Sequence, residues 1–249
     1  MTDTAAAAAA HPPLILGHRG ASHAFPDNTM AAFEGALAEG ADGAECDVQI
    51  TADGVLVLFH DQTLPDGQPV YRTGWDRLHR RFPRIPTLYS FLAWRREKAP
   101  GFHTLVELKD PDAAMAVADA LAPEPATTTV LGGFNGPALA AAKQRHGTLR
   151  TSLMVGTVVD ADLLIALARR YHCSGVHPCW EARARTPSAL ITRDTVATLH
   201  GAELSVTLWH EERPEELVRL LALGADALCT DTPGRARALI QAPSRTSLT

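Results

Sequence analysis

Two short segments pair charged side chains at a spacing of two residues. Glu45 and Asp47 enclose Cys46, and Glu107 stands two positions before Lys109. Residues two apart on a β-strand point to the same face of a sheet. Three carboxylates in one apolar setting repel one another and take up protons unless a cation joins them. The pattern therefore predicts a divalent cation held by oxygen ligands, with Mg²⁺ or Ca²⁺ favoured and Mn²⁺ as a third candidate.

Each pair taken alone has a plainer interpretation. Glu107 and Lys109 would be a surface ion pair, and Glu45 a solvated charge. Because the same pattern occurs twice, we favour a metal site with Glu45, Asp47 and Glu107 as its ligands.

Two histidines can supply a general acid and a general base. His18 precedes Arg19, and His60 is followed by Asp61, which can fix the tautomer of the imidazole. The planar guanidinium of Arg19 suits phosphate oxygens, and Lys109 adds a second cation. With a divalent ion, this set fits in-line displacement at phosphorus, in which the cations stabilise charge and the histidines move protons.

The other aromatic and histidine residues carry less information. Trp209 is interpreted equally as core or as pocket lining, and Trp180 and His177 are left outside the site. Five histidines are interpreted as surface or core residues: His11, His79, His146, His172 and His200.

Short apolar segments alternate with amphipathic ones along the chain, which indicates parallel β-strands joined by helices. The expected strands are 14–17, 43–48, 104–108, 128–131, 150–154, 175–177, 204–208 and 226–229. The expected helices are one capped by Asn28, with Met30, Phe33 and Leu37 on one face and Gly40 at its end, and those at 112–121, 137–145, 160–171, 187–200 and 214–223.

Eight such units predict an α/β fold, a (β/α)₈ TIM barrel over about residues 14–240, whose active groups lie at the carboxyl ends of the strands. An open doubly wound sheet is disfavoured because the chain has no Gly-rich phosphate loop. The stretch 60–86 is rich in Pro, Gly and Arg and shows no helical pattern. We expect it to form an excursion over the barrel mouth.

Composition limits the class of protein. The chain has 249 residues, 46% of them hydrophobic and 20% charged, with a formal net charge of −5. This predicts one globular domain over residues 1–249 with flexible termini, and it excludes disordered chains. Without a basic cluster we expect no nucleic acid and no anionic membrane as partner, but a small-molecule ligand. The oligomeric state stays open.

The cysteines, the apolar segments and the first residues of the chain indicate its redox state and compartment. The four cysteines lack the spacing of a zinc site, and we expect buried free thiols. No apolar run approaches the length of a membrane span, so no stable membrane insertion is expected. The alanine-rich start lacks the basic residues of an export signal, and we therefore expect a cytoplasmic protein.

Motifs along almost the whole chain resemble those of the glycerophosphodiester phosphodiesterases. They are His18-Arg19-Gly20, Pro26-Asp27-Asn28-Thr29, Glu45-x-Asp47, His60-Asp61, Ile85-Pro86-Thr87-Leu88, Glu107-Leu108-Lys109 and Gly224-Ala225-Asp226-Ala227-Leu228-Cys229-Thr230-Asp231. The resemblance implies a (β/α)₈ barrel with a small insertion after the second strand, at about residues 61–85. It also implies a divalent cation held by Glu45, Asp47 and Glu107, and His18 with His60 as acid and base.

The reaction that this resemblance implies is hydrolysis of deacylated phospholipids, such as glycerophosphocholine or glycerophosphoethanolamine, to an alcohol and sn-glycerol 3-phosphate. The glycerol 2-hydroxyl would attack first and give a cyclic phosphate that water opens. Two alternatives stay open: the same chemistry on lysophospholipids or another bulky diester, and a barrel without catalysis that binds phosphorylated ligands.

The sequence departs from the family pattern in several places. Asp27 replaces a Glu, Tyr89 stands where a Glu is usual, and Gly133-Phe134 replaces Ser-Phe. The segment 206–210 replaces Val-Trp-Thr-Val-Asn, which moves the aromatic residue by two positions to Trp209 and keeps it on the same strand face. With the short insertion, these changes leave substrate choice open.

Overall fold

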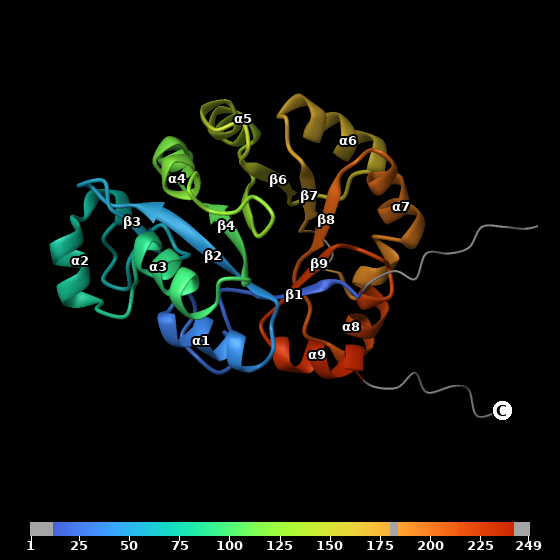
Figure 1. The fold of residues 1–249 in the computed structure, drawn as a ribbon, viewed down its shortest axis with the longest axis horizontal. Coiled ribbons are helices and arrows are strands. Elements are labelled where there is room, and N and C mark those ends of the chain that lie inside the picture. Colours follow the sequence, from blue (N-terminus) through green and yellow to red (C-terminus); the bar gives the residue numbers. More distant parts are fainter. Residues whose placement is uncertain (1–11, 180–183, 242–249) are drawn as a thin grey trace, which may run out of the picture.

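A computed structural model describes residues 12–179 and 184–241 of the chain. Eight parallel strands close into a ring in the order β1-β9-β8-β7-β6-β5-β4-β2, and β2 pairs again with β1. The helices surround the strands, as Figure 1 shows. This is the TIM barrel that the alternating pattern predicts.

The strands of the ring are β1 (Leu14–Gly17), β2 (Gly43–Ile50), β4 (His103–Leu108), β5 (Thr129–Gly133), β6 (Arg150–Val155), β7 (Gly175–Pro178), β8 (Ser205–Leu208) and β9 (Ala227–Thr230). The helices are α1 (Met30–Ala38), α2 (Trp75–Arg81), α3 (Leu88–Lys98), α4 (Ala114–Leu121), α5 (Gly136–Arg145), α6 (Ala161–Arg170), α7 (Arg193–Gly201), α8 (Pro214–Leu221) and α9 (Pro233–Gln241). Of these, α2, α3 and α9 were not among the expected helices.

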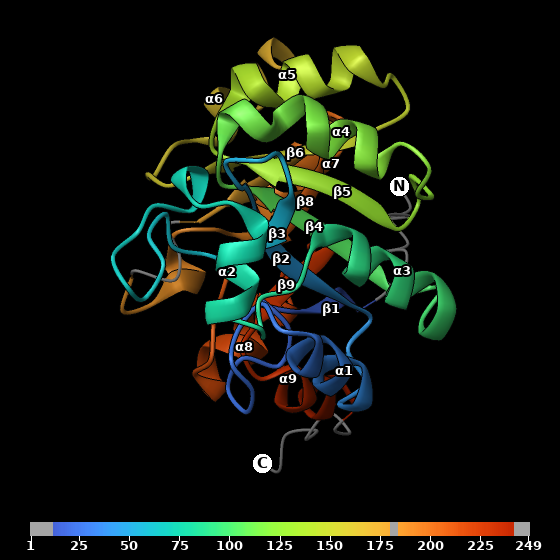
Figure 2. The same cartoon turned by 90° about the vertical axis from the view of Figure 1, so that its left-hand side faces the viewer.

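One strand lies outside the ring and begins the insertion. β3 (Leu56–Leu58) pairs antiparallel with the end of β2, with Val48 opposite Leu58. With α2 it projects beyond the ring of helices in Figure 1 and faces the viewer in Figure 2. Val57, Leu64 and Leu78 belong to a separate apolar cluster within this insertion, so the insertion packs as a small unit of its own.

The expectation of no helix in the insertion is wrong. A 3-10 helix covers Val70–Arg72, and α2 follows it. α2 buries Leu78 alone among its residues. A helix with one buried residue has no apolar repeat for a sequence pattern to detect.

Two further expectations about helices are corrected. α1 begins after Thr29, whose hydroxyl accepts from Ala32 N at 3.3 Å, so Asn28 is not its cap; Phe33 is buried as expected, whereas Leu37 is 38% exposed. The expected helix 187–200 is a 3-10 helix at Pro187–Ala189 followed by α7. The Thr192 side chain accepts from Thr195 N and starts that second helix.

The barrel interior separates the two ends of the ring. Leu16, Leu105, Met154 and Cys229 form an apolar cluster inside the strands. Beneath it, at the amino ends, lies a hollow whose lining includes Leu14, His103 and Arg150, with none of the paired carboxylates. All four cysteines are free and buried, as expected. The carboxyl ends of the strands, above the cluster, hold the candidate site.

A buried ion pair joins the barrel wall to its helices. Arg95 of α3, 1% exposed, donates to Thr129 Oγ1 at 2.9 Å and Thr104 Oγ1 at 3.3 Å. It also pairs with Glu124, which follows α4 and whose side chain is 1% exposed. Breaking a buried pair from one side leaves an uncompensated charge, which is strongly destabilising.

We therefore expect Glu124→Ala to lower the free energy of unfolding by about 3–5 kcal/mol, measured by urea denaturation. Arg96→Ala removes the other cation on Glu124, but its side chain is 55% exposed, and we expect a loss of about 1 kcal/mol or less. If the two variants had equal free energies of unfolding, the buried ion pair would contribute no more to stability than the exposed one.

Candidate active site

The strand ends bring together charged residues that lie on separate segments of the sequence. The register pairs Asp47 on β2 with Glu107 on β4. Gly17 of β1 lies opposite Ala44, so His18, which follows β1, comes next to Glu45. Arg19 N donates to Glu45 Oε2 at 3.0 Å. The expected pairing of charged residues on one face of each strand is thus present.

The backbone conformation of the turn after β1 brings Arg19 close to Glu45. Arg19 has φ 56°, a left-handed conformation that is uncommon outside glycine. Gly20 follows with φ 88°, and a Cβ there would lie 2.5 Å from the backbone of Ala32 in α1. The turn after β1 therefore lies directly against α1 and admits only glycine at this position.

Three carboxylates share one buried space. Glu45, Asp47 and Glu107 are 0–1% exposed, and each offers an oxygen within 4.8 Å of the others. Lys109 Nζ lies 3.1 Å from Asp47 Oδ1 and 2.6 Å from Glu107 Oε1, and Arg19 Nε lies 3.1 Å from Asp47 Oδ2. The ionised cluster still carries one more negative than positive charge.

The pKa values of the three carboxyl groups reflect their burial and their charged neighbours. Burial, followed by the charges of Asp47 and Glu107, raises the pKa of Glu45 well above its usual range. Burial and the charge of Asp47 raise the pKa of Glu107 to about 7, against the opposing effect of Lys109. Burial also raises the pKa of Asp47, but Lys109 and Arg19 outweigh it and the net shift is downward. Burial and mutual repulsion thus favour the protonated forms of Glu45 and Glu107, an effect that a bound cation would oppose.

The donor set fits a divalent cation. Glu45 Oε1 is buried and accepts no hydrogen bond, which is costly for an oxygen inside a protein. Carboxylate oxygens are the ligands that Mg²⁺ and Ca²⁺ prefer. A bound divalent ion would convert the excess negative charge of the cluster into a positive one, which would attract an anionic ligand.

This charge balance gives a pH dependence. Below pH 7 Glu107, with a pKa of about 7, carries a proton that an incoming cation must displace. We expect affinity for Mg²⁺ to rise with pH through this range and to fall up to about tenfold from pH 7 to pH 6 for one displaced proton. Calorimetric titration with Mg²⁺ measures it. Equal affinity at pH 6 and pH 8 would contradict the protonated cluster.

His18 is oriented by an acid at the end of β9. Its Nδ1 lies 2.7 Å from Asp231 Oδ1, and its Nε2, buried and without a hydrogen-bond partner, lies 4.0 Å from Glu45 Oε2. Burial raises the pKa of Asp231, but the hydrogen bonds from His18 and Ser22 outweigh it and lower it to about 2. An ionised Asp231 requires Nδ1 to donate, which leaves the lone pair on Nε2 facing the carboxylates.

His60 follows β3 and is half-buried. Its Nδ1 lies 2.7 Å from Asp61 Oδ1, so the expected neighbour contact is present. Gln49 on β2 holds this turn, because its Nε2 donates to the carbonyls of Phe59 and Asp61 at 2.7 and 2.6 Å. A positive charge on the His60 imidazole lowers the pKa of Asp47, which places His60 in the neighbourhood of the carboxylate cluster.

Asn28 is a site residue that the sequence analysis missed. Its Nδ2 donates to Asp47 Oδ2 at 2.7 Å and its Oδ1 accepts from Asp47 N at 3.0 Å. With φ 54°, Asn28 is another left-handed residue beside the site. Such a conformation in a residue other than glycine marks a position fixed by its surroundings. The side chain that was expected to cap α1 instead orients a carboxylate.

His210 was also missed, although it lies in a segment that departs from the family pattern. It follows β8, and its ring stacks on His18 with centroids 4.5 Å apart and planes 18° apart. Trp209 beside it meets the His18 ring edge-on at 5.2 Å, so it lines the site. His177 is fully buried beneath Trp209, and burial lowers its pKa to about 3. It is a neutral residue of the barrel interior.

The remaining residues singled out in the sequence lie away from the carboxylates or outside the described chain. Asp27 pairs with Arg19 Nη1 at 3.1 Å, whereas Tyr89 is 56% exposed on α3. His79 stacks on Trp75 in the insertion. Four features lie outside the described residues: Trp180, His11, the alanine run and the tail 243–249. The expected flexibility of the two termini therefore stays a prediction.

Comparison with known proteins shows the family of the chain. The sequence pattern of the glycerophosphoryl diester phosphodiesterase family matches residues 18–235. The chain belongs to this family. As a member of it, the protein is an enzyme, a phosphoric diester hydrolase, and its matched range runs from His18 to beyond Asp231.

Two relatives match this chain over most of its length. An uncharacterized protein YqiK of Bacillus subtilis is 29% identical over 91% of this chain and 98% of its own. A glycerophosphodiester phosphodiesterase of Bacillus altitudinis is 26% identical over 89% of this chain and 96% of its own.

Solved structures share the fold. An Oleispira antarctica phosphodiesterase, in complex with the product sn-glycerol 3-phosphate, superposes with a TM-score of 0.78 at 22% identity, covering 93% of this chain and 98% of its own. A putative glycerophosphoryl diester phosphodiesterase of Silicibacter pomeroyi gives 0.77 at 25% identity, covering 92% and 94%.

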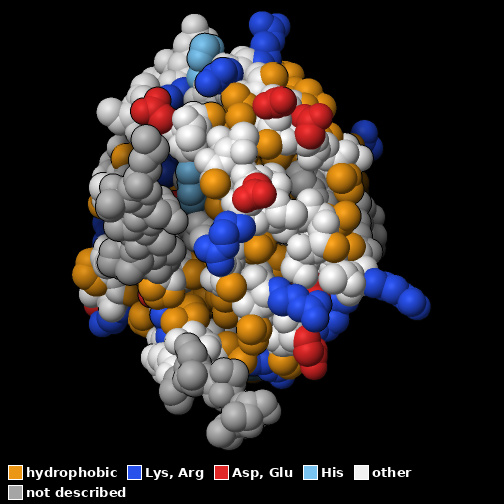
Figure 3. Space-filling model, turned by 90° about the vertical axis from the view of Figure 1, so that its right-hand side faces the viewer, with side chains coloured by type: hydrophobic (Ala, Val, Ile, Leu, Met, Phe, Trp, Pro, Cys, Tyr) orange, Lys and Arg blue, Asp and Glu red, His pale blue; other side chains and the backbone are white. Residues whose placement is uncertain are grey.

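Within residues 12–179 and 184–241, none of the helices combines the length and the apolar character needed to cross a bilayer. On the face in Figure 3, lysine and arginine side chains are scattered among acidic and apolar ones rather than gathered in one track.

Proposed function

We propose that the protein hydrolyses glycerophosphodiesters, such as glycerophosphocholine or glycerophosphoethanolamine, to an alcohol and sn-glycerol 3-phosphate. The observation that carries the proposal is the buried cluster of Glu45, Asp47 and Glu107 next to the unpartnered Nε2 of His18. Membership of the family and the product-bound Oleispira antarctica relative support the substrate class.

We propose Glu45, Asp47 and Glu107 as ligands of a divalent cation, Mg²⁺ or Ca²⁺, with Mn²⁺ as a third candidate. When bound, such an ion stabilises charge on the phosphoryl oxygens and acidifies a nearby hydroxyl. Asn28 holds Asp47 in place through its two hydrogen bonds. Arg19 and Lys109 lie beside the carboxylates, and their side chains would bind the remaining phosphate oxygens.

The two histidines take complementary roles in this proposal. Burial lowers the pKa of His18 against the opposing hydrogen bond of Asp231, so His18 is neutral at pH 7. Its Nε2 accepts the proton of the attacking glycerol 2-hydroxyl, and His60 donates a proton to the leaving alcohol oxygen. The cyclic phosphate that results is opened by water, with the two roles reversed.

Two other functions are compatible with the same scaffold. A bulky diester such as a lysophospholipid would use the same groups and enter over the short insertion. A barrel that only binds phosphorylated ligands would not require two histidines in the neighbourhood of the carboxylates. We therefore rank glycerophosphodiester hydrolysis first.

Coupled assays for glycerol phosphate and for choline test this ranking. Purified protein is given glycerophosphocholine, glycerophosphoethanolamine or lysophosphatidylcholine, each with Mg²⁺, Ca²⁺ or Mn²⁺. We expect release of sn-glycerol 3-phosphate from the deacylated diesters. Choline release from the lysophospholipid alone would favour the bulky-diester function, and binding without turnover of any diester would favour the non-catalytic one.

A further inference from the structure

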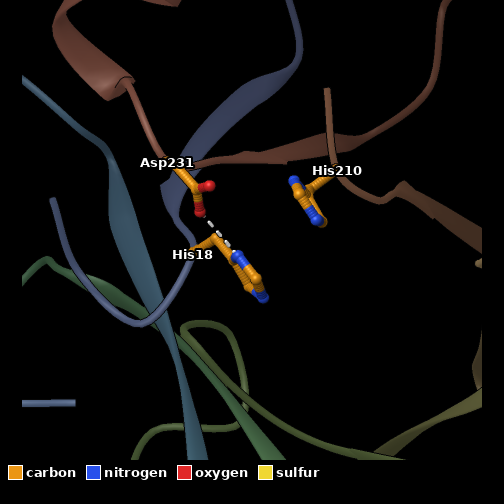
Figure 4. A group of neighbouring side chains, drawn as sticks. All are labelled: His18, His210 and Asp231. Carbon is orange, nitrogen blue, oxygen red and sulfur yellow. Dashed lines mark hydrogen bonds and ion pairs between the residues drawn. The ribbon is translucent and has the colours of Figure 1, made fainter. Parts of the chain in front are cut away.

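A second group of metal-ligating side chains lies on the other side of His18 from the carboxylates. His18, His210 and Asp231 come from the carboxyl ends of β1, β8 and β9, which are neighbours in the ring. Each offers a ligand atom within 4.8 Å of the others. Figure 4 shows the two imidazoles side by side, with the carboxylate of Asp231 directed toward His18.

This group differs chemically from the carboxylate cluster. Two imidazoles and one carboxylate form the kind of donor set that binds Zn²⁺ and other late first-row ions, whereas three carboxylates suit Mg²⁺ or Ca²⁺. The late ions also bind nitrogen ligands more tightly, in the order Co²⁺ < Ni²⁺ < Cu²⁺ > Zn²⁺. The two sites therefore select different metals.

Two of the three side chains are accessible to an ion, and one imidazole nitrogen has no hydrogen-bond partner. The side chains of His210 and Asp231 are each 31% exposed, while that of His18 is 6% exposed. His210 Nδ1 is buried without a hydrogen bond, and Glu212 Oε1 lies 3.7 Å away from it. Glu212 thus adds negative charge beside the site without occupying the imidazole nitrogen.

We propose that His18, His210 and Asp231 bind a late first-row transition-metal ion, with Zn²⁺ as the physiological candidate, and that this ion inhibits the enzyme. The ion replaces the hydrogen bond between His18 Nδ1 and Asp231 Oδ1 with a bond to each atom. The proton leaves Nδ1, and a proton from solvent binds Nε2, so the imidazole stays neutral. Nε2 then has no lone pair to act as a base.

Binding is tested on the full chain with Co²⁺, whose visible d–d absorption reports its ligands, after Mg²⁺ has saturated the carboxylates. We expect a spectrum with nitrogen ligation in the unaltered protein and at least about tenfold weaker binding in His210→Asn. His200→Asn is the matched control, because His200 also contacts an aspartate, Asp226, at 2.9 Å. Its Co²⁺ affinity should not change.

Asp231→Asn is the second variant, and it should weaken Co²⁺ binding as well. Circular dichroism and the urea midpoint establish that each variant is folded. If folded His210→Asn and Asp231→Asn both bind Co²⁺ as tightly as the unaltered protein, the proposed site is wrong. The same holds if the unaltered protein shows no nitrogen-ligated spectrum.

The inhibitory effect rests on the proposed hydrolysis, but Co²⁺ binding does not, so the two can fail separately. With saturating Mg²⁺, the Zn²⁺ concentration for half-inhibition should rise at least about tenfold in His210→Asn relative to His200→Asn. Equal inhibition of both variants would mean that Zn²⁺ acts by displacing the ion on Glu45, Asp47 and Glu107, which overturns the inhibitory role.

Discussion

His18→Ala should lower kcat for glycerophosphocholine by about a hundredfold or more, the usual scale for loss of a proton-transfer group. The expectation rests on the direction of its Nε2, which faces the carboxylates because Nδ1 is held by Asp231 at 2.7 Å. Removing the imidazole removes the base but leaves the carboxylates in place. The measurement is steady-state turnover at saturating substrate and cation.

His60→Ala should show a loss of similar size, and His200→Ala serves as the control. His200 is an exposed histidine on α7 with an aspartate partner, and its removal should leave turnover within about twofold, as for a surface substitution of about 0.5 kcal/mol or less. Cation affinity should persist in His18→Ala. If either His18→Ala or His60→Ala turned over at the normal rate, the assignment of acid and base would be wrong.

Glu107→Gln should raise the cation concentration needed for half-maximal activity by about tenfold or more. The amide removes one negatively charged oxygen ligand. It also removes the ion-pair partner of Lys109, whose Nζ lies 2.6 Å from Glu107 Oε1 in the unaltered protein. A titration of activity with Mg²⁺ measures the shift, and a chelator should abolish activity in every variant.

Glu34→Gln is the matched control for this substitution, because Glu34 is an exposed glutamate on α1. Its Mg²⁺ titration should match that of the unaltered protein. An unchanged titration in Glu107→Gln would exclude Glu107 as a ligand, whatever its effect on the maximal rate.

The sequence predicted the scaffold and the groups that come from strands. The alternation of short apolar and amphipathic segments indicated the barrel, and the spacing in Glu45-x-Asp47 and Glu107-x-Lys109 indicated which side chains share a strand face. The barrel then required those faces to meet at the carboxyl ends. Periodicity is a local property, so a local pattern suffices to detect it.

The residues that were missed act through contacts between distant parts of the chain. Asn28 bonds to Asp47 from 19 positions away, and Asp231 orients His18 from 213 positions away. His210 reaches His18 only because β8 and β9 close the ring beside β1. Each was visible as a residue type, and Asp231 ended a motif, but no spacing along the chain connects them to their partners.

The metal site is tested most directly by a crystal of the protein grown with Mn²⁺ and measured at the manganese absorption edge. We expect an anomalous peak bonded to oxygens of Glu45, Asp47 and Glu107, with His18 Nε2 facing it. A map in which those carboxylates hold no ion, while Mn²⁺ is bound elsewhere or nowhere, would contradict it.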